Sequence, residues 1–403
     1  MTVNEKVPLH EVCDIGNGYA FKSTEFQSVG TPLLRISNIN NNRVSFGEGT
    51  AYVAPERLET HSDYVVNNGD VVIALSGATT GKYGVYLHDT PCLLNQRIGI
   101  IRKTPSDTLY LRYFYFYLNV LRSEILRKAE GAAQPNISTK EIGQFKIPLP
   151  PLAEQKKIAD ILDAADQLRQ KDQQLIDHCT ALSQSLFLEM FGDPVSNLKQ
   201  WKLLSLGELC EFENGDRSSN YPSKLDIQES GKLFLSSADI KHGYFEFGSS
   251  KFISNSKYRS LKRGKCRRGD VLMTLRGNGL GRTCVFECEY DEGFINAQMV
   301  IIRPDTKKVT PRFLVSQLNH DDVFSQLLSH SSGSAQPQFS AAEIKKFKVL
   351  VPPGELQEKF ERYNDKIDVQ KRQVEANMVK SESLFNSLLQ KAFKGELTST
   401  KVA

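Results

Sequence analysis

Two glycines and a lysine stand close together in "LSGATTGKYG" (75–84), a combination that can bind a phosphate group. A P-loop has four residues between its glycines and a Ser or Thr after its lysine, so that backbone N–H groups surround the phosphates and the hydroxyl binds Mg²⁺. Here three residues separate Gly77 from Gly81, and Tyr83 follows Lys82. β-Branched runs flank the segment on both sides, where a P-loop passes from a strand into a helix. The spacing therefore disfavours a nucleotide site.

No other set of residues predicts catalysis. The chain lacks H-E-x-x-H and the Asn/Asp-Pro-Pro-aromatic tetrapeptide of methyltransferases, and a nuclease-like use of Asp305 with Glu343 is disfavoured because a predicted helix and a Gly/Ser loop intervene. Seven cysteines, including a lone C-x3-C at Cys284 and Cys288, are interpreted as small buried residues in a reducing cytosol rather than as a zinc site. We predict a non-catalytic binding protein without metal or cofactor; an enzyme with a degenerate phosphate loop remains the least favoured alternative.

The charge of the chain is unevenly distributed. The net charge is +4, and residues 201–353 carry 22 basic and 17 acidic side chains. The densest basic segment, "KRGKCRRGD" (262–270), is of a kind that attracts polyanions, although a cationic surface loop is an equally ordinary explanation. The opening "MTVNEKVPLHEV" has no apolar core typical of a signal peptide, and no run reaches the roughly 18 apolar residues of a membrane span.

The chain is a tandem repeat. "GDVVIALSGATTGKYGVY" (69–86) aligns without a gap with "GDVLMTLRGNGLGRTCVF" (269–286), and the cation recurs as Lys82 and Arg282. Three further pairs follow at offsets between 200 and 202: "NQRIGIIR" with "NAQMVIIR", "GAAQPNIS" with "GSAQPQFS", and "LPP" with "VPP". Self-similarity at half the chain length indicates two copies of one unit.

Each unit predicts a globular part followed by a long helix. Short β-branched runs such as "GDVVIAL" alternate with Gly, Asn and Pro turns, and helices are expected near 108–128 and 310–328. The aromatic run "YLRYFYFYL" in the first of these helices favours a core-facing helix over a base-stacking platform. A double proline then precedes each long helix. The predicted fold is α+β, with mixed α/β domains at 1–150 and 196–353, long helices at 151–195 and 354–395, and a C-terminal tail at 396–403.

The long helices carry a heptad pattern whose steps alternate between three and four residues, as in a coiled coil. The expected seam of the first helix is Ile158, Ile161, Ala165, Leu168, Asp172, Leu175, Cys179, Leu182, Leu186 and Met190. The expected seam of the second is Phe360, Tyr363, Ile367, Gln370, Val374, Asn377, Ser381, Leu384, Leu388 and Ala392. The polar members either set the register of a packed helix pair or face solvent, and the pattern leaves both possibilities open.

The chain resembles the DNA-specificity subunit of type I restriction–modification enzymes over essentially its whole length. The resemblance rests on "IPLPPLAEQKKIADILDAADQL" (147–168), the preceding "GAAQPNIS", and the weaker echo "VLVPPGELQEKFERYNDKID" (349–368), which departs from the family pattern at the helix entry. It implies two target-recognition domains that each read half of a split, asymmetric double-stranded DNA sequence. It also implies that the two helices pack antiparallel with pseudo-two-fold symmetry and fix the gap between the half-sites.

The resemblance further implies partners that supply the chemistry. Two methyltransferase subunits would bring S-adenosylmethionine and methylate adenine, and motor-nuclease subunits would complete the restriction enzyme. The repeat agrees independently with two DNA contacts, since rods of about 55–60 Å can span half-sites about 34 Å apart. The alternative is a coiled-coil scaffold or regulator that binds other proteins or RNA.

The side-chain chemistry and the position of several residues make them candidates for DNA contact. Phosphate contacts are expected from cations beside the paired glycine loops and in the basic segment: Lys82, Arg276, Arg282, Arg267 and Arg268. Base-edge contacts are expected from Arg35, Asn38, Arg43, Asn95, Gln96 and Arg97 in the first domain, and from Arg217, Lys241, Asn278, Asn296 and Gln298 in the second. Asn95 and Asn296 are equally good structural turn residues, because they recur although the two half-sites should differ.

Overall fold

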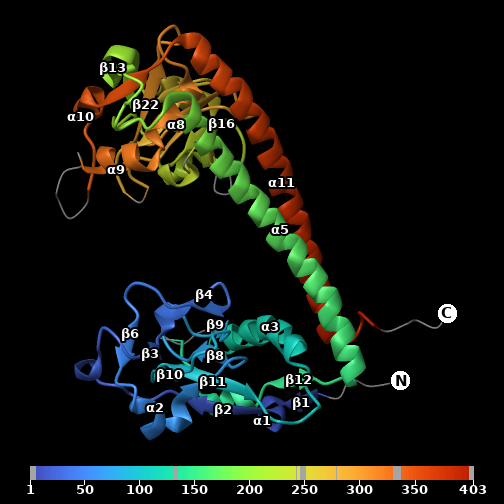
Figure 1. Cartoon of the computed structure of the whole chain (residues 1–403). Helices are drawn as coiled ribbons and strands as arrows, with labels where there is room; N and C mark the ends of the chain where they lie inside the picture. Colours follow the sequence, from blue (N-terminus) through green and yellow to red (C-terminus); the bar gives the residue numbers. More distant parts are fainter. Residues whose placement is uncertain are drawn as a thin grey trace. The chain divides into compact units, whose positions relative to one another are not determined.

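The chain forms two compact units, each built from one globular domain and half of each long helix. A computed structural model describes residues 6–129, 135–241, 243–245, 251–277, 279–329 and 337–398 (Figure 1). The first unit comprises 1–172 with 377–403, and the second comprises 173–376. These units cut across the expected domain limits, which treat each helix as a separate segment. No helix in the described part of the chain is long and apolar enough to cross a membrane.

The described residues of the first unit form three sheets. Their strand orders are β2-β11-β8-β9-β5-β4, β6-β3-β10-β7 and β1-β12. The strands are β1 (Lys6–Pro8), β2 (Cys13–Asn17), β3 (Thr31–Leu34), β4 (Ile39–Asn40), β5 (Arg43–Val44), β6 (Ala51–Val53), β7 (Val65–Val66), β8 (Val71–Ala74), β9 (Tyr83–Val85), β10 (Cys92–Leu94), β11 (Ile98–Lys103) and β12 (Lys146–Pro148). The helices are α1 (Leu9–Val12), α2 (Arg57–Thr60), α3 (Leu111–Ala129), α4 (Thr139–Gly143) and the start of α5 (Leu152–Phe191).

The second unit repeats this plan. Its sheets have the orders β14-β22-β19-β20, β15-β17-β16-β21-β18 and β13-β23. The strands are β13 (Lys202–Ser205), β14 (Cys210–Asn214), β15 (Ile227–Gln228), β16 (Lys232–Leu235), β17 (Lys251–Ile253), β18 (Lys265–Arg267), β19 (Val271–Thr274), β20 (Thr283–Val285), β21 (Glu292–Ile295), β22 (Met299–Pro304) and β23 (Lys348–Val351). The helices are α6 (Leu206–Leu209), α7 (Asn255–Ser260), α8 (Pro311–Leu318), α9 (Asp321–Ser329), α10 (Ala341–Lys346) and the start of α11 (Gly354–Lys394).

The helices near 108–128 and 310–328 differ between the copies. The first is continuous as α3, whereas the second is divided into α8 and α9. The aromatic run of α3 faces the core, where Tyr113, Phe114 and Tyr117 are buried. The hydroxyl of Tyr113 donates to Pro148 O at 2.9 Å, and that of Tyr117 donates to Lys146 O at 3.0 Å. The interpretation of this run as core rather than base-stacking surface is therefore supported.

Each long helix is fixed to its domain by a fully buried glutamine in its first turn. Gln155 accepts from Tyr110 N at 2.8 Å and donates to Thr108 O and Pro150 O, both at 2.8 Å. Gln357 makes the corresponding bonds, at 2.9 Å to Thr310 N, 3.1 Å to Lys308 O and 2.8 Å to Pro352 O. The departure of "PPGELQ" from "PPLAEQ" therefore leaves this attachment intact.

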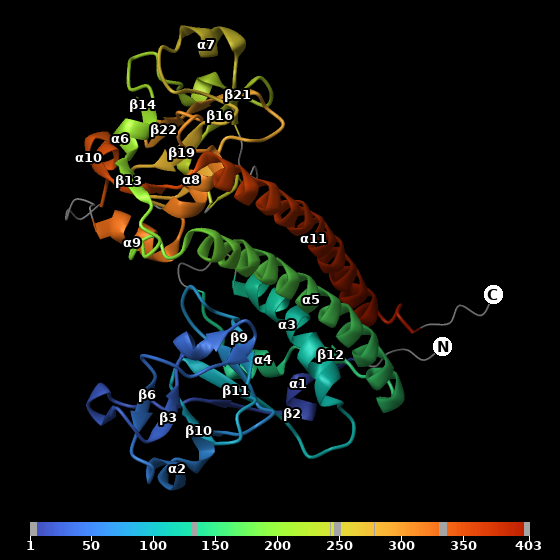
Figure 2. The same ribbon diagram turned by 45° about the horizontal axis from the view of Figure 1, so that its top comes forward.

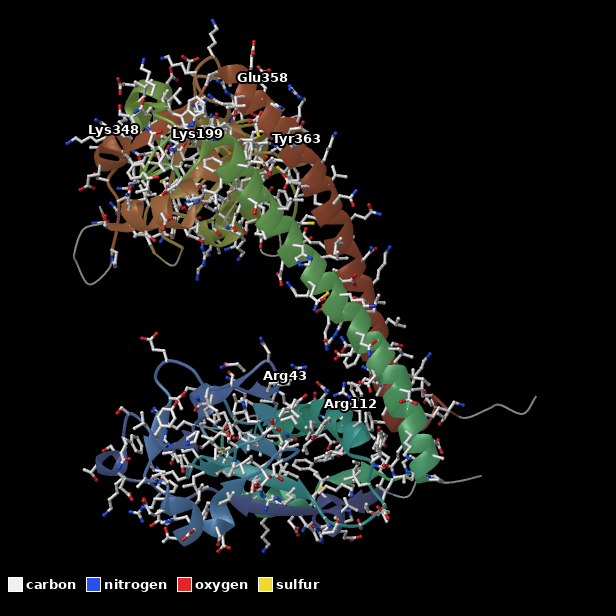
Figure 3. All side chains as sticks on the ribbon, in the orientation of Figure 1. Arg43, Arg112, Lys199, Lys348, Glu358 and Tyr363 are labelled. Atoms are coloured by element: carbon white, nitrogen blue, oxygen red, sulfur yellow. The ribbon has the colours of Figure 1, made fainter. Side chains whose placement is uncertain are left out.

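An arginine adds a second attachment in both units. Arg112 of α3 donates to Asp163 of α5, with Nε 2.7 Å from Oδ1 (Figure 3), and α3 lies along the first half of α5 (Figure 2). In the second unit Arg312 pairs with Asp365 and Asp368 of α11. Burial raises the pKa of the Asp368 carboxyl, an effect that the Arg312 charge opposes. Because these contacts lie beside the glutamine contacts, the helix and its domain are held at more than one point.

Within each unit the segments of α5 and α11 pack antiparallel. In the first unit Ser381 Oγ donates to Asp172 Oδ2 at 2.8 Å, and the Arg169 guanidinium lies 4.2 Å from the centre of the Phe385 ring. In the second unit the rings of Phe187 and Phe360 lie 5.8 Å apart. Residue numbers rise along α5 as those of their partners on α11 fall, which establishes the antiparallel direction.

Every second residue of the expected seam lies in the contact between the two helices. At the positions between them the seam is wrong by one residue, because the next residue along the chain takes that place. Leu162 is fully buried, and Arg169, Ile176 and Ser183 continue its row, whereas Leu168, Leu175 and Leu182 are exposed by 45%, 48% and 56%. In α11 the buried residues Asn364 and Phe385 replace the exposed Tyr363 and Leu384, and Gln370 and Asn377 are likewise exposed. The other expected seam residues are buried or half-buried: Ile158, Ile161, Ala165, Asp172, Cys179, Leu186, Met190, Phe360, Ile367, Val374, Ser381, Leu388 and Ala392.

The sequence permits two seams because steps of three then four residues, and steps of four then three, both average 3.5 residues. Apolar residues at 161, 168, 175 and 182 favoured one phase, while the folded helices use the other. The row of residues that packs between the helices includes polar side chains, because these side chains are hydrogen-bonded. Ser381 bonds to Asp172, and Ser183 Oγ donates to Asn364 Oδ1 at 2.5 Å. The polar seam members Asp172 and Ser381 thus join the helices, while Gln370 and Asn377 face solvent.

Candidate nucleic-acid interface

The candidate DNA-contacting residues of the first unit gather where two parallel strands end. β3 and β10 run parallel, with Leu34 beside Leu94, so the residues that follow them share one edge. Asn95 N donates to Leu34 O at 3.1 Å. Arg35 and the turn Asn95–Gln96–Arg97 therefore emerge together, and Arg35, Gln96 and Arg97 are exposed.

The glycine loop at 75–82 is the hairpin turn between β8 and β9. Ala74 N donates to Lys82 O at 2.8 Å, and Gly81 N donates to Ala74 O at 2.9 Å. Gly77 and Gly81 have φ of 84° and 81°, a region that side-chain-bearing residues rarely adopt. The glycines thus serve the turn geometry. Leu75 N donates to Arg97 O at 3.0 Å, which joins this loop to the turn at 95–97.

A second hairpin, β4–β5, completes the edge. Its turn residues Asn41 and Asn42 have φ of 48° and 58°, as asparagine tolerates in tight hairpins. Arg43 pairs with Val85 of β9, and Lys82 Nζ lies 3.5 Å from Asn40 Oδ1. Figure 3 labels Arg43 at this place. We call residues 35–44, 75–82 and 95–97 the first loop edge.

The second unit builds the same edge from the equivalent strands. β16 and β21 run parallel with Leu235 beside Ile295, and Asn296 N donates to Leu235 O at 2.9 Å. Leu275 N donates to Gln298 O at 2.8 Å, and Gly243 N donates to Thr283 O at 2.9 Å. We call the described residues of 236–245, 275–282 and 296–298 the second loop edge. It carries Lys241, Arg276, Arg282, Asn296 and Gln298; the candidate Asn278 lies outside the described residues.

Three candidate asparagines have structural roles. Asn38 is 7% exposed; its Oδ1 accepts from Arg35 N at 3.0 Å and its Nδ2 donates to Ser45 O at 3.2 Å. Asn95 Oδ1 accepts from Gln96 N at 2.7 Å, and Asn296 Oδ1 accepts from Gln298 N at 3.1 Å. These bonds shape the turns that present the neighbouring side chains, and they engage both the Oδ1 and the Nδ2 of Asn38 with the backbone.

The basic segment 262–270 is split between two ends of a strand. Gly264 O accepts from Ile295 N at 2.9 Å, which places Lys262 and Arg263 beside the second loop edge. Arg267 pairs with Glu292 at the other end of β21, and Arg268 Nη2 donates to Cys288 O at 2.7 Å. Arg267 and Arg268 therefore lie at the opposite end of the strand from the second loop edge, while Lys262 and Arg263 lie beside that edge. A strand advances by about 3.3 Å per residue, which separates cations that are neighbours in the sequence.

The loop edges are suited to polyanions. The first loop edge contains Arg35, Arg43, Lys82 and Arg97 and no Asp or Glu. At the second, Arg217 lies with Lys262 and Arg263, because its Nη2 donates to Ala297 O at 3.1 Å. The acids near this edge are engaged internally: Asp239 caps the turn after β16 through Ser236 N, and Asp216 accepts from Ser218 N. Cations that project from two copies of one scaffold match the charge of a DNA backbone.

A separate apolar stripe lies on α5. Leu168, Leu175 and Leu182 are exposed and seven residues apart, which keeps them near one face of the helix. Ile161 is half-buried and continues the row. Exposed leucines in such a row are typical of a helix-docking surface. We call these four residues the α5 stripe.

Comparison with protein families gives one match that occurs twice in the chain. The model described as "Type I restriction modification DNA specificity domain" matches residues 2–178 and again residues 198–375. Each match covers one globular domain and the first part of the helix that follows it. The two matches therefore coincide with the internal repeat.

Individual relatives give the same result. The "Type I restriction enzyme EcoBI specificity subunit" of Escherichia coli is 26% identical over 426 residues, covering 98% of this chain and 86% of the relative. The MjaVIII specificity subunit of Methanocaldococcus jannaschii is 34% identical over 171 residues, covering 41% of this chain and 40% of the relative. Among solved structures, the S subunit of a type I restriction–modification system from M. genitalium aligns with a TM-score of 0.55 and 17% identity over 96% of both chains, which shows a shared fold.

Proposed function

Because the chain belongs to the family of type I restriction–modification DNA specificity proteins, we propose that its two loop edges each read one half of a bipartite, asymmetric DNA site. The observation that carries this proposal is the duplicated edge, in which the same turns present cations from parallel strand ends. Lys82 and Arg282 occupy the same place in the two copies, and both side chains are half-exposed. We assign them to phosphates, since a phosphate is what every half-site shares.

The long helices would set the distance between the half-sites. α5 has 40 residues, which corresponds to about 60 Å and exceeds one turn of DNA, about 34 Å. Each domain is held to its helix by a buried glutamine and an arginine, so a change in helix length is transmitted to the domain. Removal of one heptad shortens a helix by about 10.5 Å, the rise of about three base pairs at 3.4 Å each.

The α5 stripe would dock a helix of a methyltransferase subunit. Two such subunits would carry S-adenosylmethionine and the adenine chemistry, and motor-nuclease subunits would carry ATP hydrolysis and cleavage. The present chain would contribute recognition and assembly. The absence of a recognised catalytic motif in the sequence and the family's description as a DNA specificity domain support this proposed division of labour.

The test is co-expression of the chain with the methyltransferase subunits of its own system, followed by sequencing of methylated adenines. We expect a bipartite motif with a fixed gap. Exchange of residues 1–150 for those of another family member should change one half only, and removal of one heptad from both helices should change the gap but neither half. Methylation at a continuous palindrome would contradict the proposal, and preferential binding of RNA would favour the scaffold alternative.

A further inference from the structure

We propose that the two half-sites are told apart by side chains that lie beside the turns at 95–97 and 296–298, where the copies share a backbone but differ in chemistry. In the first unit these are Tyr19, His61 and Tyr64; in the second they are Arg217, Lys262 and Arg263. The inference deepens the proposed function, on which it rests, and assigns a thymine-methyl contact to the first half-site and a guanine contact to the second.

The shared backbone is visible in two glycines that touch the turns. A Cβ on Gly18 would lie 2.1 Å from Asn95 O, and a Cβ on Gly215 would lie 2.3 Å from Asn296 O. Gly18 N donates to Ile98 O at 2.9 Å, and Gly215 N to Met299 O at 3.4 Å. The chain therefore passes the turn in the same way in both units. Tyr19 follows the first glycine directly, whereas Asp216 follows the second and Arg217 reaches the turn through its bond to Ala297 O.

A second segment reaches the same place in both units. In the first it is 61–64, between α2 and β7, and β7 pairs with β10 through Val65 and Leu93. In the second it is 261–264, between α7 and β18, and β18 pairs with β21 through Lys265 and Phe294. Because β10 and β21 lead directly into the two turns, each segment lies next to its turn.

In the first unit the side chains beside the turn at 95–97 are aromatic. Tyr19 is 37% exposed, and its ring lies 4.5 Å from that of His61, 5.0 Å from that of Phe21 and 5.2 Å from that of Tyr64. Tyr19 N donates to Leu94 O at 2.9 Å, which anchors it at the start of the turn. An exposed aromatic surface in a groove contacts the thymine methyl group, which no other standard base presents.

In the second unit the exposed side chains beside the turn at 296–298 are cationic. Asp216 is 5% exposed and joins two loops: its Oδ1 accepts from Ser218 N at 2.7 Å and its Oδ2 from Lys262 N at 3.3 Å. Arg217, Lys262 and Arg263 are exposed around it. Arginine and lysine are the side chains that best recognise guanine O6 and N7.

Positions with the same chemistry in both copies cannot make the half-sites differ. Lys82 and Arg282 are both cations, and Asn95 and Asn296 both cap their own turns. The aromatic and the cationic groups come from equivalent segments but not from identical positions, since Tyr19 corresponds to Asp216. Lys262 and Arg263 correspond to Ser62 and Asp63, so the two segments present different chemistry beside the same turn. These side chains are therefore the groups that can give the two edges different sequence preferences.

The experiment uses the full chain co-expressed with its methyltransferase subunits and compares motifs of methylated DNA. Tyr19→Ala with His61→Ala should lower the preference at an A·T pair of the first half-site about tenfold or more, leaving the second half and the gap unchanged. Arg217→Ala with Lys262→Ala and Arg263→Ala should do the same at a G·C pair of the second half. A mismatched base pair in a recognition site typically costs about 1–3 kcal/mol, and 1.4 kcal/mol is a factor of ten.

Lys307→Ala is the matched control, since it removes an exposed cation beyond the far end of β22, the strand that begins beside the turn at 296–298, and it should leave the motif unchanged. The conservative variant Tyr19→Phe should keep the thymine preference because the ring remains, and circular dichroism should show that each variant is folded. An unchanged motif, or a uniform loss of methylation at all sites, would overturn the inference. Absence of a bipartite motif in the unaltered chain would instead overturn the proposed function.

Discussion

Replacement of Leu162 by alanine should destabilise the first unit by about 3 kcal/mol, whereas the same replacement at Leu168 should cost less than about 1 kcal/mol. Both leucines lie on α5, but Leu162 is fully buried and Leu168 is 45% exposed. Leu162 belongs to the core that also contains Ile158 and Phe385, so the shortened side chain leaves a cavity. Leucine and alanine have similar helix propensities, and helix formation itself contributes little to the difference.

The measurement is urea unfolding followed by far-ultraviolet circular dichroism. The single tryptophan, Trp201, belongs to the second unit, where its Nε1 donates to Phe191 O at 2.8 Å. Its fluorescence therefore reports on that unit separately, and Leu162→Ala should affect it less than the dichroism signal. Hydrogen exchange in the first half of α5 should increase in Leu162→Ala and stay unchanged in Leu168→Ala.

The same pair of residues separates stability from docking. Leu168→Ala combined with Leu175→Ala should weaken binding of the methyltransferase subunit at least tenfold while unfolding stays as in the unaltered chain. Equal destabilisation by Leu162→Ala and Leu168→Ala would refute the seam described here and restore the phase expected from the sequence. Unchanged methyltransferase binding would show that the α5 stripe is not the docking surface.

Two further changes test the helix attachment and the phosphate contacts. Gln357→Ala should lower the free energy of urea unfolding of the second unit by about 3 kcal/mol or more, since one backbone donor and two carbonyls lose their buried partner. Gln370→Ala, at an exposed site of the same helix, is the control and should be nearly neutral. Equal effects of the two changes would contradict the attachment. Lys82→Ala or Arg282→Ala should weaken DNA binding across all sequences and reduce the slope of log K against log salt by about one unit, and a change in sequence preference would identify the residue as a base reader instead.

The repeat explains why so much of the architecture could be predicted. Two copies aligned at a nearly constant offset, and each copy marked its helix entry with a double proline and a glutamine. The structure uses these signals directly, because Gln155 and Gln357 bond to the proline carbonyls that precede them. Gly77 and Gly81 also form the tight turn between strands that their spacing predicts.

The seam and the basic segment show where the sequence was insufficient. Ile161 and the leucines at 168, 175 and 182 do not decide which row of the helix is buried. The choice depends on partners such as Phe385 and Asn364 from a helix about 200 residues away. The five cations of 262–268 looked like one patch in the sequence, yet a three-residue strand carries Arg267 to the opposite end from Lys262. The buried row of the helix and the separation of the cations both depend on three-dimensional neighbours, which a local sequence pattern cannot specify.

The internal repeat also separates scaffold from recognition. Residues that are identical in the two copies have partners inside their own unit: Asp70 and Asp270 bind Arg102 and Arg303. The Lys82 and Arg282 pair is different, because the charge is kept while both side chains remain half-exposed at the edges. A group common to two edges that read different sequences can serve only what those sequences have in common, and in DNA that is the phosphate backbone. Discrimination must then come from places where the copies differ, and beside the two loop edges we propose that these are the aromatic cluster around Tyr19 and the cations around Asp216.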